Sequence, residues 1–572
     1  MKKILIKKED IYLLVCSVFF SVFILIGRSY QISNSCNAVF KNPIYSFIKF
    51  IALIGVLYFI LKTAKTLIKK YETLEIKIKN DKLNNLFNNH TFITSLIMIC
   101  TGWLIYIIAF YPTIMTIDAY NQLKQYFNIE NYYSDTVNLL SKDVLLTNHH
   151  PVLHTIMMGG LLDFGKSLGN ERIGIFFYTL LQVMILAATL AYSIKYLKDN
   201  GIKNRFLYLI LLIYIIVPTF PFFAITATKD TIYTALIILY IIQIHKFINY
   251  AQKRKISIKE MIILIILMTL IWLMRNNGIH VMIASFLPVI FYSKENMKRC
   301  FSIFIIMMIL NTSYNKLLLP SLNITAASGR ETLSIPFQQT ARYIKYYEND
   351  ITIEEKEIIN HVLHYDIIKN LYTPQNADPV KGTYKKSATD EDVNRYFQVW
   401  KMQYSRHPWL YWDSVINDNY GYFYPQLSKS YIYYQDITQP IFRKIANFGY
   451  SNYKENFVDC SFNNLEKLRE SLVNYAKTFQ YIPVAGLLVN VAINNWVLII
   501  LLAYCISTKQ KNKILILLPG LLTIIVCIIS PLDNCFRYAM PTIFSNPLVL
   551  LLIINKKNKF NEEVINDLNR KK

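Results

Sequence analysis

The chain has 572 residues, of which 53% are hydrophobic and only 17% are charged. This composition excludes an ordinary soluble globular protein and predicts a polytopic membrane protein. The formal net charge of +24 would favour nucleic-acid binding in a soluble chain, but the lysines here stand in short runs between apolar segments. Such runs orient membrane helices, so nucleic acid is not expected as a partner.

Apolar segments of membrane-spanning character follow one another along the chain. The first stands behind the basic sequence MKKILIKKED and lacks a small-residue cleavage site, so we expect a membrane helix and not a cleaved signal. A window of about 19 residues finds about 12 such segments. They lie near residues 11–27, 45–61, 92–110, 173–194, 206–223, 231–248, 259–274, 278–292, 301–318, 487–506, 513–529 and 539–554.

The loops between these segments predict their orientation, because Lys and Arg concentrate in cytoplasmic loops. Six basic stretches share the cytoplasmic side only if residues 151–166 do not cross the membrane. That stretch begins with Pro151, which suits a first helical position, and its apolar run is interrupted by Gly159, Gly160 and Asp163. It is predicted to be a short external or re-entrant helix, with an ordinary spanning helix as the alternative. The basic stretches are 62–90, 195–205, 249–260, 294–299, 508–513 and the tail from 556.

Both termini are then cytoplasmic, and two long segments face outside. The first large external loop is 111–172, and the second segment, 319–486, is long enough to be a folded, mainly helical, aromatic-rich external domain. We therefore expect an all-α bundle of about 12 transmembrane helices in three parts: an N-terminal transmembrane module at 1–318, the external domain at 319–486, and C-terminal transmembrane helices with a basic tail at 487–572. Cys36, Cys460 and Cys535 are predicted on the external side of the membrane, and the sequence leaves open whether two of them form a disulfide.

The most informative polar sequence, YPTIMTIDAYNQ at 111–122, directly follows an apolar segment. Asp118 lies about two helical turns beyond that segment, and an ionisable residue at the membrane surface indicates a functional site. Tyr120 and Gln122 stand beside it, and His149 and His150 follow in TNHHPVLH. The histidine at 154 is four residues after His150, but no Glu stands at HExxH spacing, so no metal ligands are assigned.

Further polar residues are predicted on the same outer surface. Lys229 and Asp230 stand where one apolar segment begins, although such a pair can also simply end a helix. Arg275 lies in the turn RNNG, where it could equally be an anchor at the membrane surface. Arg537 and Tyr538 precede the last segment, and Gln338 and Arg342 stand near the start of the external domain.

This layout resembles the GT-C superfamily of membrane glycosyltransferases, which includes protein mannosyltransferases and aminoarabinose transferases. The likeness lies in an acidic residue just after a spanning helix, the His-Pro pair at 150–151, a second acidic residue at 230, and the RYxxP element at 537–541. The combination of TxDAYNQ, NHHPVLH, ATKD, IPFQQTARY and GYFYP is more specifically similar to uncharacterised bacterial multispanning families grouped with those enzymes. A WWDYG-type stretch is not found, and the small external domain departs from the mannosyltransferase pattern, which leaves the acceptor open.

The resemblance implies transfer of a sugar from a polyprenyl-phosphate donor to an envelope glycan, glycolipid or protein on the outer face of the cytoplasmic membrane. Asp118 would be the catalytic base. Asp230 would orient Lys229 or, with Asp118, hold a divalent cation such as Mg²⁺ or Mn²⁺, which the sequence does not require. The remaining candidates would bind phosphate or position substrate: Tyr120, Gln122, His149, His150, Lys229, Arg275, Gln338, Arg342, Arg537 and Tyr538.

Two other function classes stay open. A transporter or flippase for a lipid-linked envelope precursor would favour Gly- or Pro-broken helices with charges at the bilayer midplane. A non-catalytic scaffold for envelope assembly would explain the external domain. Neither explains the grouping of Asp118 with Lys229 and Asp230 at one outer edge as directly as an enzyme does.

Overall fold

The computed structural model describes residues 10–73, 81–128, 146–250, 254–327, 329–428, 430–432 and 463–555. In these ranges the regular structure is almost entirely helical, and strands β1 (Ile114–Met115) and β2 (Thr226–Ala227) have two residues each. The all-α class is thereby confirmed. The long apolar helices agree with a multi-pass membrane protein.

Eight described helical stretches are long and apolar enough to cross a membrane, and a ninth is reached if two bent helices count as one span. The bent pair is α10 (Asn204–Ile216) and α11 (Thr219–Ile225), which meet at 54° where Pro218 cannot continue the hydrogen-bond ladder of α10. The eight are α1 (Ile11–Ser33), α3 (Pro43–Thr73), α5 (Thr91–Ala109), α9 (Glu171–Asp199), α12 (Lys229–Tyr250), the stretch Lys294–Ser321 around α15 (Met297–Ser313), α26 (Lys511–Ile529) and α27 (Phe536–Ile554).

The remaining three predicted segments are also helices, but they are short. α13 (Ile258–Met274) and α25 (Val491–Ser507) have 17 residues each, and α14 (Gly278–Tyr292) has 15. A straight span needs about 20 residues. Among the described residues, helix length therefore supports eight or nine spans where the apolar pattern predicts about 12.

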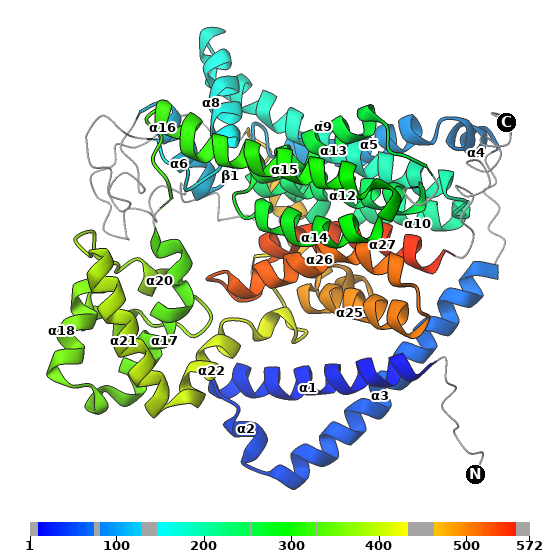
Figure 1. Cartoon of the computed structure of the whole chain (residues 1–572). Helices are drawn as coiled ribbons and strands as arrows, with labels where there is room; N and C mark the ends of the chain where they lie inside the picture. Colours follow the sequence, from blue (N-terminus) through cyan, green and yellow to red (C-terminus); the bar gives the residue numbers. More distant parts are fainter. Residues whose placement is uncertain are drawn as a thin grey trace, which may run out of the picture.

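Stretch 151–166 forms a single helix, α8 (Val152–Ser167), which packs against α9 and α6 (Ile117–Tyr126) (Figure 1). A helix is found here as expected, and it continues through Gly159 and Gly160. Gly159 faces the ring of Tyr126, where a Cβ would come within 2.2 Å of the ring, so the small residue serves packing against α6.

The short parallel ladder of β1 and β2 positions the site. Ile114 pairs with Thr226 and Met115 with Ala227. Each strand runs almost directly into a helix, β1 into α6 and β2 into α12. Because the strands are parallel and in register, the first turns of α6 and α12 begin side by side.

The helices between Ser334 and Asn417 belong to the segment predicted to be external, and they are called the external region below. They have their own core, built on Phe337, Ile344, Ile359 and Val399 among others. Figure 1 shows the external region as a separate group of helices beside the bundle. Its helices are α17 (Ser334–Tyr347), α18 (Ile353–Val362), α19 (Tyr365–Leu371), α20 (Asp378–Lys381), α21 (Asp390–Arg406) and α22 (Pro408–Asn417). By contrast, α24 (Glu466–Phe479) packs against α5, where Arg469 donates to the carbonyl of Ala109 at 3.0 Å.

The remaining described helices are α2 (Asn37–Phe40), α4 (Asp81–Asn89) and α16 (Leu319–Ser321). Cys36 and Cys535 are free and buried in the structure, and Cys460 lies outside the described residues. A disulfide between Cys36 and Cys535 is therefore not formed here.

Candidate functional site

Arg537, the second residue of α27, lies between two carboxylates. Its Nη1 donates to Asp118 Oδ2 at 2.7 Å, and its Nε lies 3.4 Å from Asp230 Oδ2. Arg275, in the turn between α13 and α14, donates from Nη1 to Asp230 Oδ1 at 2.7 Å. The expected proximity of Asp118 and Asp230 is therefore found, with one guanidinium contacting both.

The two carboxylates occupy matching positions. Asp118 is the second residue of α6 and Asp230 the second residue of α12, and each closes a Thr-x-Asp sequence that follows its paired strand. Thr116 caps α6 by accepting from the Ala119 amide at 3.0 Å, and it donates to the Ala227 carbonyl at 2.9 Å. Acidic residues in a first helical turn are stabilised by the helix dipole. This repeated Thr-x-Asp pattern is visible in the sequence, but it was not used to predict the site.

Lys229 reaches the site through His150. The Lys229 Nζ donates to His150 Nδ1 at 2.7 Å, and His150 Nε2 lies 4.0 Å from Asp118 Oδ1. Burial and the Lys229 charge hold the pKa of His150 well below its usual range. His150 is therefore neutral at pH 7, and because its Nδ1 accepts from Lys229, its proton lies on Nε2, toward Asp118.

The site carries more positive than negative charge. Lys229, Arg275 and Arg537 face the two carboxylates of Asp118 and Asp230. Burial raises the pKa of Asp118, but Arg537 and Lys229 outweigh it and hold that pKa well below its usual range, so Asp118 is ionised. Asp230 is 1% exposed and Asp118 is 27% exposed. An ionised group at an open edge beside excess cations suits an anionic ligand.

Tyr538 joins this cluster through its ring. Its centroid lies 5.1 Å from the Arg275 guanidinium carbon and 5.3 Å from that of Arg537. The ring thus lies beside both cations and limits how far they can move. Tyr538 therefore belongs to the same cluster as Arg275 and Arg537.

Tyr120 and Gln122 are not directed into the cluster. Tyr120 is buried against Ala119, Leu123 and Met158. Gln122 is also buried and bonds to His154, its Oε1 lying 2.9 Å from His154 Nδ1. Their assignment to substrate binding is therefore not supported by their placement: both hold α6 against α8.

His154 heads a buried hydrogen-bond chain that supports the site. Its Nε2 lies 2.7 Å from the Tyr178 hydroxyl, which donates to Gln182 at 2.8 Å. The Gln182 amide donates to the carbonyls of Phe223, Ala224 and Thr226, just before Lys229 and Asp230. The chain thus ties α8 and α9 to β2.

The external region reaches the site through His149. His149 Nδ1 lies 3.8 Å from Glu331 Oε1, and Lys381 Nζ lies 2.9 Å from both Glu331 Oε2 and Asp378 Oδ1. Burial lowers the pKa of His149 to about 4, so it is neutral at pH 7. Neither Glu331 nor Lys381 was predicted as a site residue, because their pairing exists only between distant segments.

Gln338 and Arg342 lie in the external region, away from the Asp118 cluster. Arg342 donates to the Tyr372 hydroxyl and to the carbonyl of Asn34, each at 2.9 Å, and lies 3.4 Å from Asp413. Gln338 donates to the Thr373 carbonyl at 2.6 Å. Both residues join helices of the external region to one another, and Arg342 also joins them to the end of α1, so the structure does not bring them together with the Asp118 cluster.

The carboxylates are poorly arranged for a divalent cation. Arg537 and Arg275 already contact oxygens of Asp118 and Asp230, and a cation would have to displace them. Within the described ranges, no group of three or more His, Cys, Asp or Glu side chains is placed to hold a metal. The residues present fit an anion better than a metal.

Comparison with known proteins places the chain in one family. Residues 9–566 match a family of unknown function, DUF6020, and since this is nearly the whole chain, the chain belongs to that family. No curated protein matches it. No solved structure matches it either.

Proposed function

We propose that this member of a family without an assigned function is a membrane glycosyltransferase, which moves a sugar from a polyprenyl-phosphate-linked donor to a cell-envelope acceptor. The observation that carries the proposal is the bridge of Arg537 between Asp118 and Asp230, beside Lys229 and Arg275. It combines an ionised carboxylate with excess positive charge. Transfer from a phosphate needs both groups at one place.

The reaction assigns a role to each group. The bond between the sugar's anomeric carbon and the phosphate oxygen breaks, and a bond from the acceptor oxygen to that carbon forms. Asp118 takes the acceptor proton. Lys229 and Arg537 stabilise the negative charge on the departing phosphate, an effect worth about 3 kcal/mol for one well-placed donor.

The resting ion pair makes Asp118 a weak base, because Arg537 holds its pKa low. A bound donor phosphate would compete with Asp118 for Arg537. As that contact weakens, the pKa of Asp118 rises and the carboxylate becomes a better base. Donor binding would therefore activate the base, while His150 and Lys229 stay beside it.

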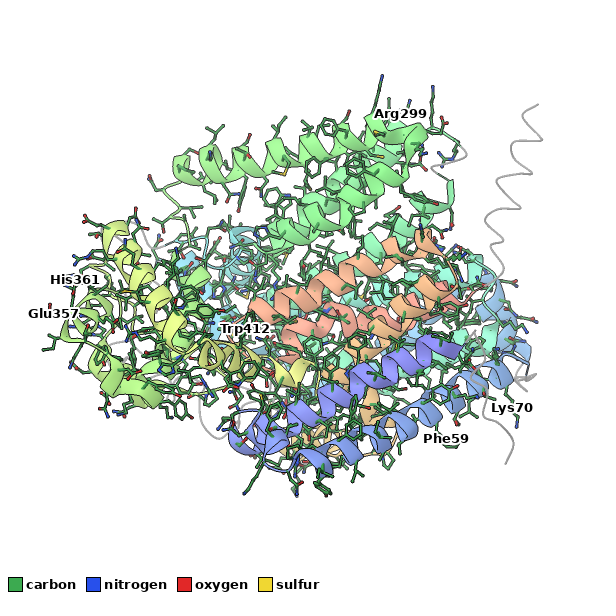
Figure 2. The ribbon with its side chains drawn as sticks, turned by 60° about the horizontal axis from the view of Figure 1, so that its bottom comes forward. Phe59, Lys70, Arg299, Glu357, His361 and Trp412 are labelled. Atoms are coloured by element: carbon green, nitrogen blue, oxygen red, sulfur yellow. The ribbon has the colours of Figure 1, made fainter. Side chains whose placement is uncertain are left out.

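The membrane arrangement is part of the proposal. We place about 12 helices across the cell membrane, with both termini in the cytoplasm, α8 external or re-entrant, and the Asp118 site outside. Figure 2 supports this orientation, since Lys70 and Arg299 lie at the end of the molecule away from Glu357 and His361 of the external region. Lys and Arg favour the cytoplasmic side.

Labelling of single cysteines in intact cells tests this orientation. Glu357→Cys should react with a membrane-impermeant maleimide, and Lys298→Cys should react only after the cells are opened. Both variants are compared with the unmodified chain, whose own cysteines are mostly buried. The opposite labelling pattern would place the site inside and remove the proposed acceptor.

A transporter or flippase is the second candidate, and one observation favours it. α10 and α11 form a span broken by 54°, and the break leads through β2 to Lys229. Broken helices whose ends meet a charged substrate are typical of transporters. The charges here gather at helix ends, however, which favours the enzyme.

Transfer of a radiolabelled sugar by the detergent-purified chain decides between the two. The donor is extracted from a deletion strain as the polyprenyl-linked sugar that accumulates there. An enzyme transfers the label without a membrane, whereas a flippase shows no chemistry in detergent. Asp163→Asn, a change at an exposed carboxylate of α8, is the matched control and should transfer normally. Absence of transfer together with accumulation on the inner leaflet would favour the flippase.

A further inference from the structure

An apolar slot opens in the bundle toward the other end of α27. Its volume is about 370 Å³, within the range of roughly 300–1,000 Å³ common for ligand pockets. Its walls come from α3, α10, α25 and α27, with Phe220 of α11 and Leu488 of the short turn before α25. Lining residues include Leu67, Tyr71, Phe206, Ile213, Ile543 and Leu550.

The end of α3 forms one wall of the slot, through Leu67, Ile68 and Tyr71. α3 also packs against α1. Near its end, the Tyr71 hydroxyl donates to the Arg205 carbonyl at 3.3 Å, and the Tyr71 and Phe206 rings meet edge to face at 5.1 Å. α3 and α27 thus line opposite walls of one opening.

The lining suits a hydrocarbon chain. Of the described residues that line it, two carry amide side chains, Asn494 and Asn546, and these bond to each other: Asn546 Nδ2 donates to Asn494 Oδ1 at 2.9 Å and to its carbonyl at 3.0 Å. The remaining wall is almost entirely aliphatic and aromatic. In a bilayer, such an opening is filled by lipid chains, because neither water nor a polar solute gains partners there.

The depth of the slot selects one leaflet. From Ile543 to Ile554 the lining follows α27 for about 16 Å, close to half of the ~30 Å hydrocarbon core. Arg537 and the Asp118 site lie at the opposite end of α27. A chain in the slot therefore belongs to a lipid of the leaflet away from that site.

Three cations, none of which lines the slot itself, neighbour lining residues at this end: Arg205, Lys70 and Lys513. Arg205 precedes Phe206, and its guanidinium carbon lies 5.6 Å from the Phe206 ring centroid. Lys70 precedes Tyr71 on α3, and Figure 2 shows it at the far end of that helix. Lys513, a residue of α26, lies against the end of α27, where its Nζ donates to the carbonyls of Ile553 and Asn555. Cations at this level attract anionic headgroups.

We propose that the slot binds an anionic phospholipid from the leaflet opposite the Asp118 site, with one acyl chain between α3 and α27 and the phosphate beside Arg205. The lipid fills the opening and fastens the end of α3 to the bundle. This site is separate from the proposed donor site, and its test does not depend on any transfer activity.

Native mass spectrometry of the full chain tests the proposal. The detergent-purified protein is given equal amounts of phosphatidylglycerol and phosphatidylcholine with identical acyl chains. The wild type should retain phosphatidylglycerol at least about fivefold better, the scale expected for one or two cations at a headgroup. Equal retention of the two lipids would overturn the proposal.

Two variants locate the lipid. Leu67→Trp narrows the slot from an exposed position of α3, so folding should be retained, and it should lower retention of phosphatidylglycerol about tenfold. Ile60→Trp, also exposed on α3 but outside the slot, is the matched control and should behave as the wild type. Unchanged retention in Leu67→Trp would contradict the location.

Arg205→Gln should abolish the preference for phosphatidylglycerol, while Lys298→Gln, an exposed cation on α15, should not change it. If a polyprenyl phosphate copurifies and Leu67→Trp releases it, the slot holds a donor chain and the phospholipid assignment is wrong. That result would leave the proposed transferase intact. If the wild-type protein retains phosphatidylglycerol as expected but transfers no sugar, only the proposed function is contradicted.

Discussion

Two buried arginine–aspartate clusters in the described part of the chain differ in charge balance and in exposure. In the external region, Arg342 faces Asp413, whose other oxygen accepts from the Tyr30 hydroxyl. Their side chains are 4% and 9% exposed. In the bundle, Arg537 shares two carboxylates with further cations, and Asp118 stays 27% exposed.

This difference separates a structural contact from a candidate binding site. The Arg342 cluster pairs one cation with one carboxylate, and Arg342 also donates to the Tyr372 hydroxyl and to the carbonyl of Asn34. It therefore fastens α17 to α1 and α22. The Arg537 cluster keeps excess positive charge near an open carboxylate, so it can still accept an anion. The presence of an arginine beside an aspartate does not by itself distinguish the two clusters.

The largest effect is expected from a substitution that breaks the Arg342 cluster. Arg342→Ala leaves Asp413 buried without its cation, and removing one partner of a buried ion pair costs about 3–5 kcal/mol. The free energy of unfolding should fall by that amount, as measured by denaturant unfolding in detergent. Transfer per folded molecule should stay near the wild-type value. A fall in transfer with unchanged stability would reverse the roles of the two clusters.

The next effect concerns the base. Asp118→Asn keeps the size of the side chain and an acceptor for Arg537, so the protein should fold, but transfer should fall by roughly 100-fold, the usual scale for removing a general base. Initial rates with saturating donor measure this effect, with Asp163→Asn as the control. Near-normal transfer by well-folded Asp118→Asn would exclude Asp118 as the base and favour transport.

A smaller effect is expected at Lys229. Lys229→Gln keeps a donor for His150 Nδ1 and removes the charge, so the KM for the donor should rise about tenfold with little change in stability. Lys229→Arg keeps the charge and is the matched control. If both variants raise the KM for the donor equally, the charge of Lys229 does not account for the effect.

The smallest effect is a pH dependence outside both clusters. Burial raises the pKa of Asp533, in the loop before α27, to about 7. The folded protein then holds a proton that the unfolded chain loses near pH 4, so this group's contribution to stability falls as pH rises from about 4 to 7. Asp533→Asn should therefore gain stability relative to the wild type at pH 8, by about 1 kcal/mol or more.

Thermal unfolding of both proteins between pH 4 and pH 8 measures this gain. The Asn side chain keeps an oxygen that can accept from the Gly421 amide, which Asp533 Oδ1 now does at 2.8 Å. The two melting curves should converge toward pH 4. Parallel curves across the range would show that Asp533 has an ordinary pKa in the folded protein.

Several features of this protein follow from the sequence by itself. Every predicted apolar segment corresponds to a helix or, at 206–223, to the bent pair of helices, because long apolar runs in a membrane must satisfy their backbone hydrogen bonds internally. The grouping of Asp118, Lys229, Asp230, Arg275 and Arg537 also followed, since each stands where an apolar segment ends on one side.

Side-chain direction depended on the tertiary structure. Tyr120 is two residues after Asp118, about 200° around α6, so it points into the core when Asp118 points to Arg537. Gln122 is four residues after Asp118, about one turn farther along α6, and meets His154 there. Proximity in sequence does not place side chains on one face, and the face that is buried depends on which helices pack there.

Long-range pairing was likewise decided only by the fold. The register of β1 with β2 makes the two Thr-x-Asp sequences equivalent, yet the strands have two residues each and leave no periodic pattern to read. Arg342 and Arg537 look alike in sequence, and only the partners brought by distant helices distinguish them: Asp413 from α22 and Asp118 from α6. Local patterns determine helices because their hydrogen bonds are local, whereas the balance of charge in a cluster depends on residues hundreds of positions apart.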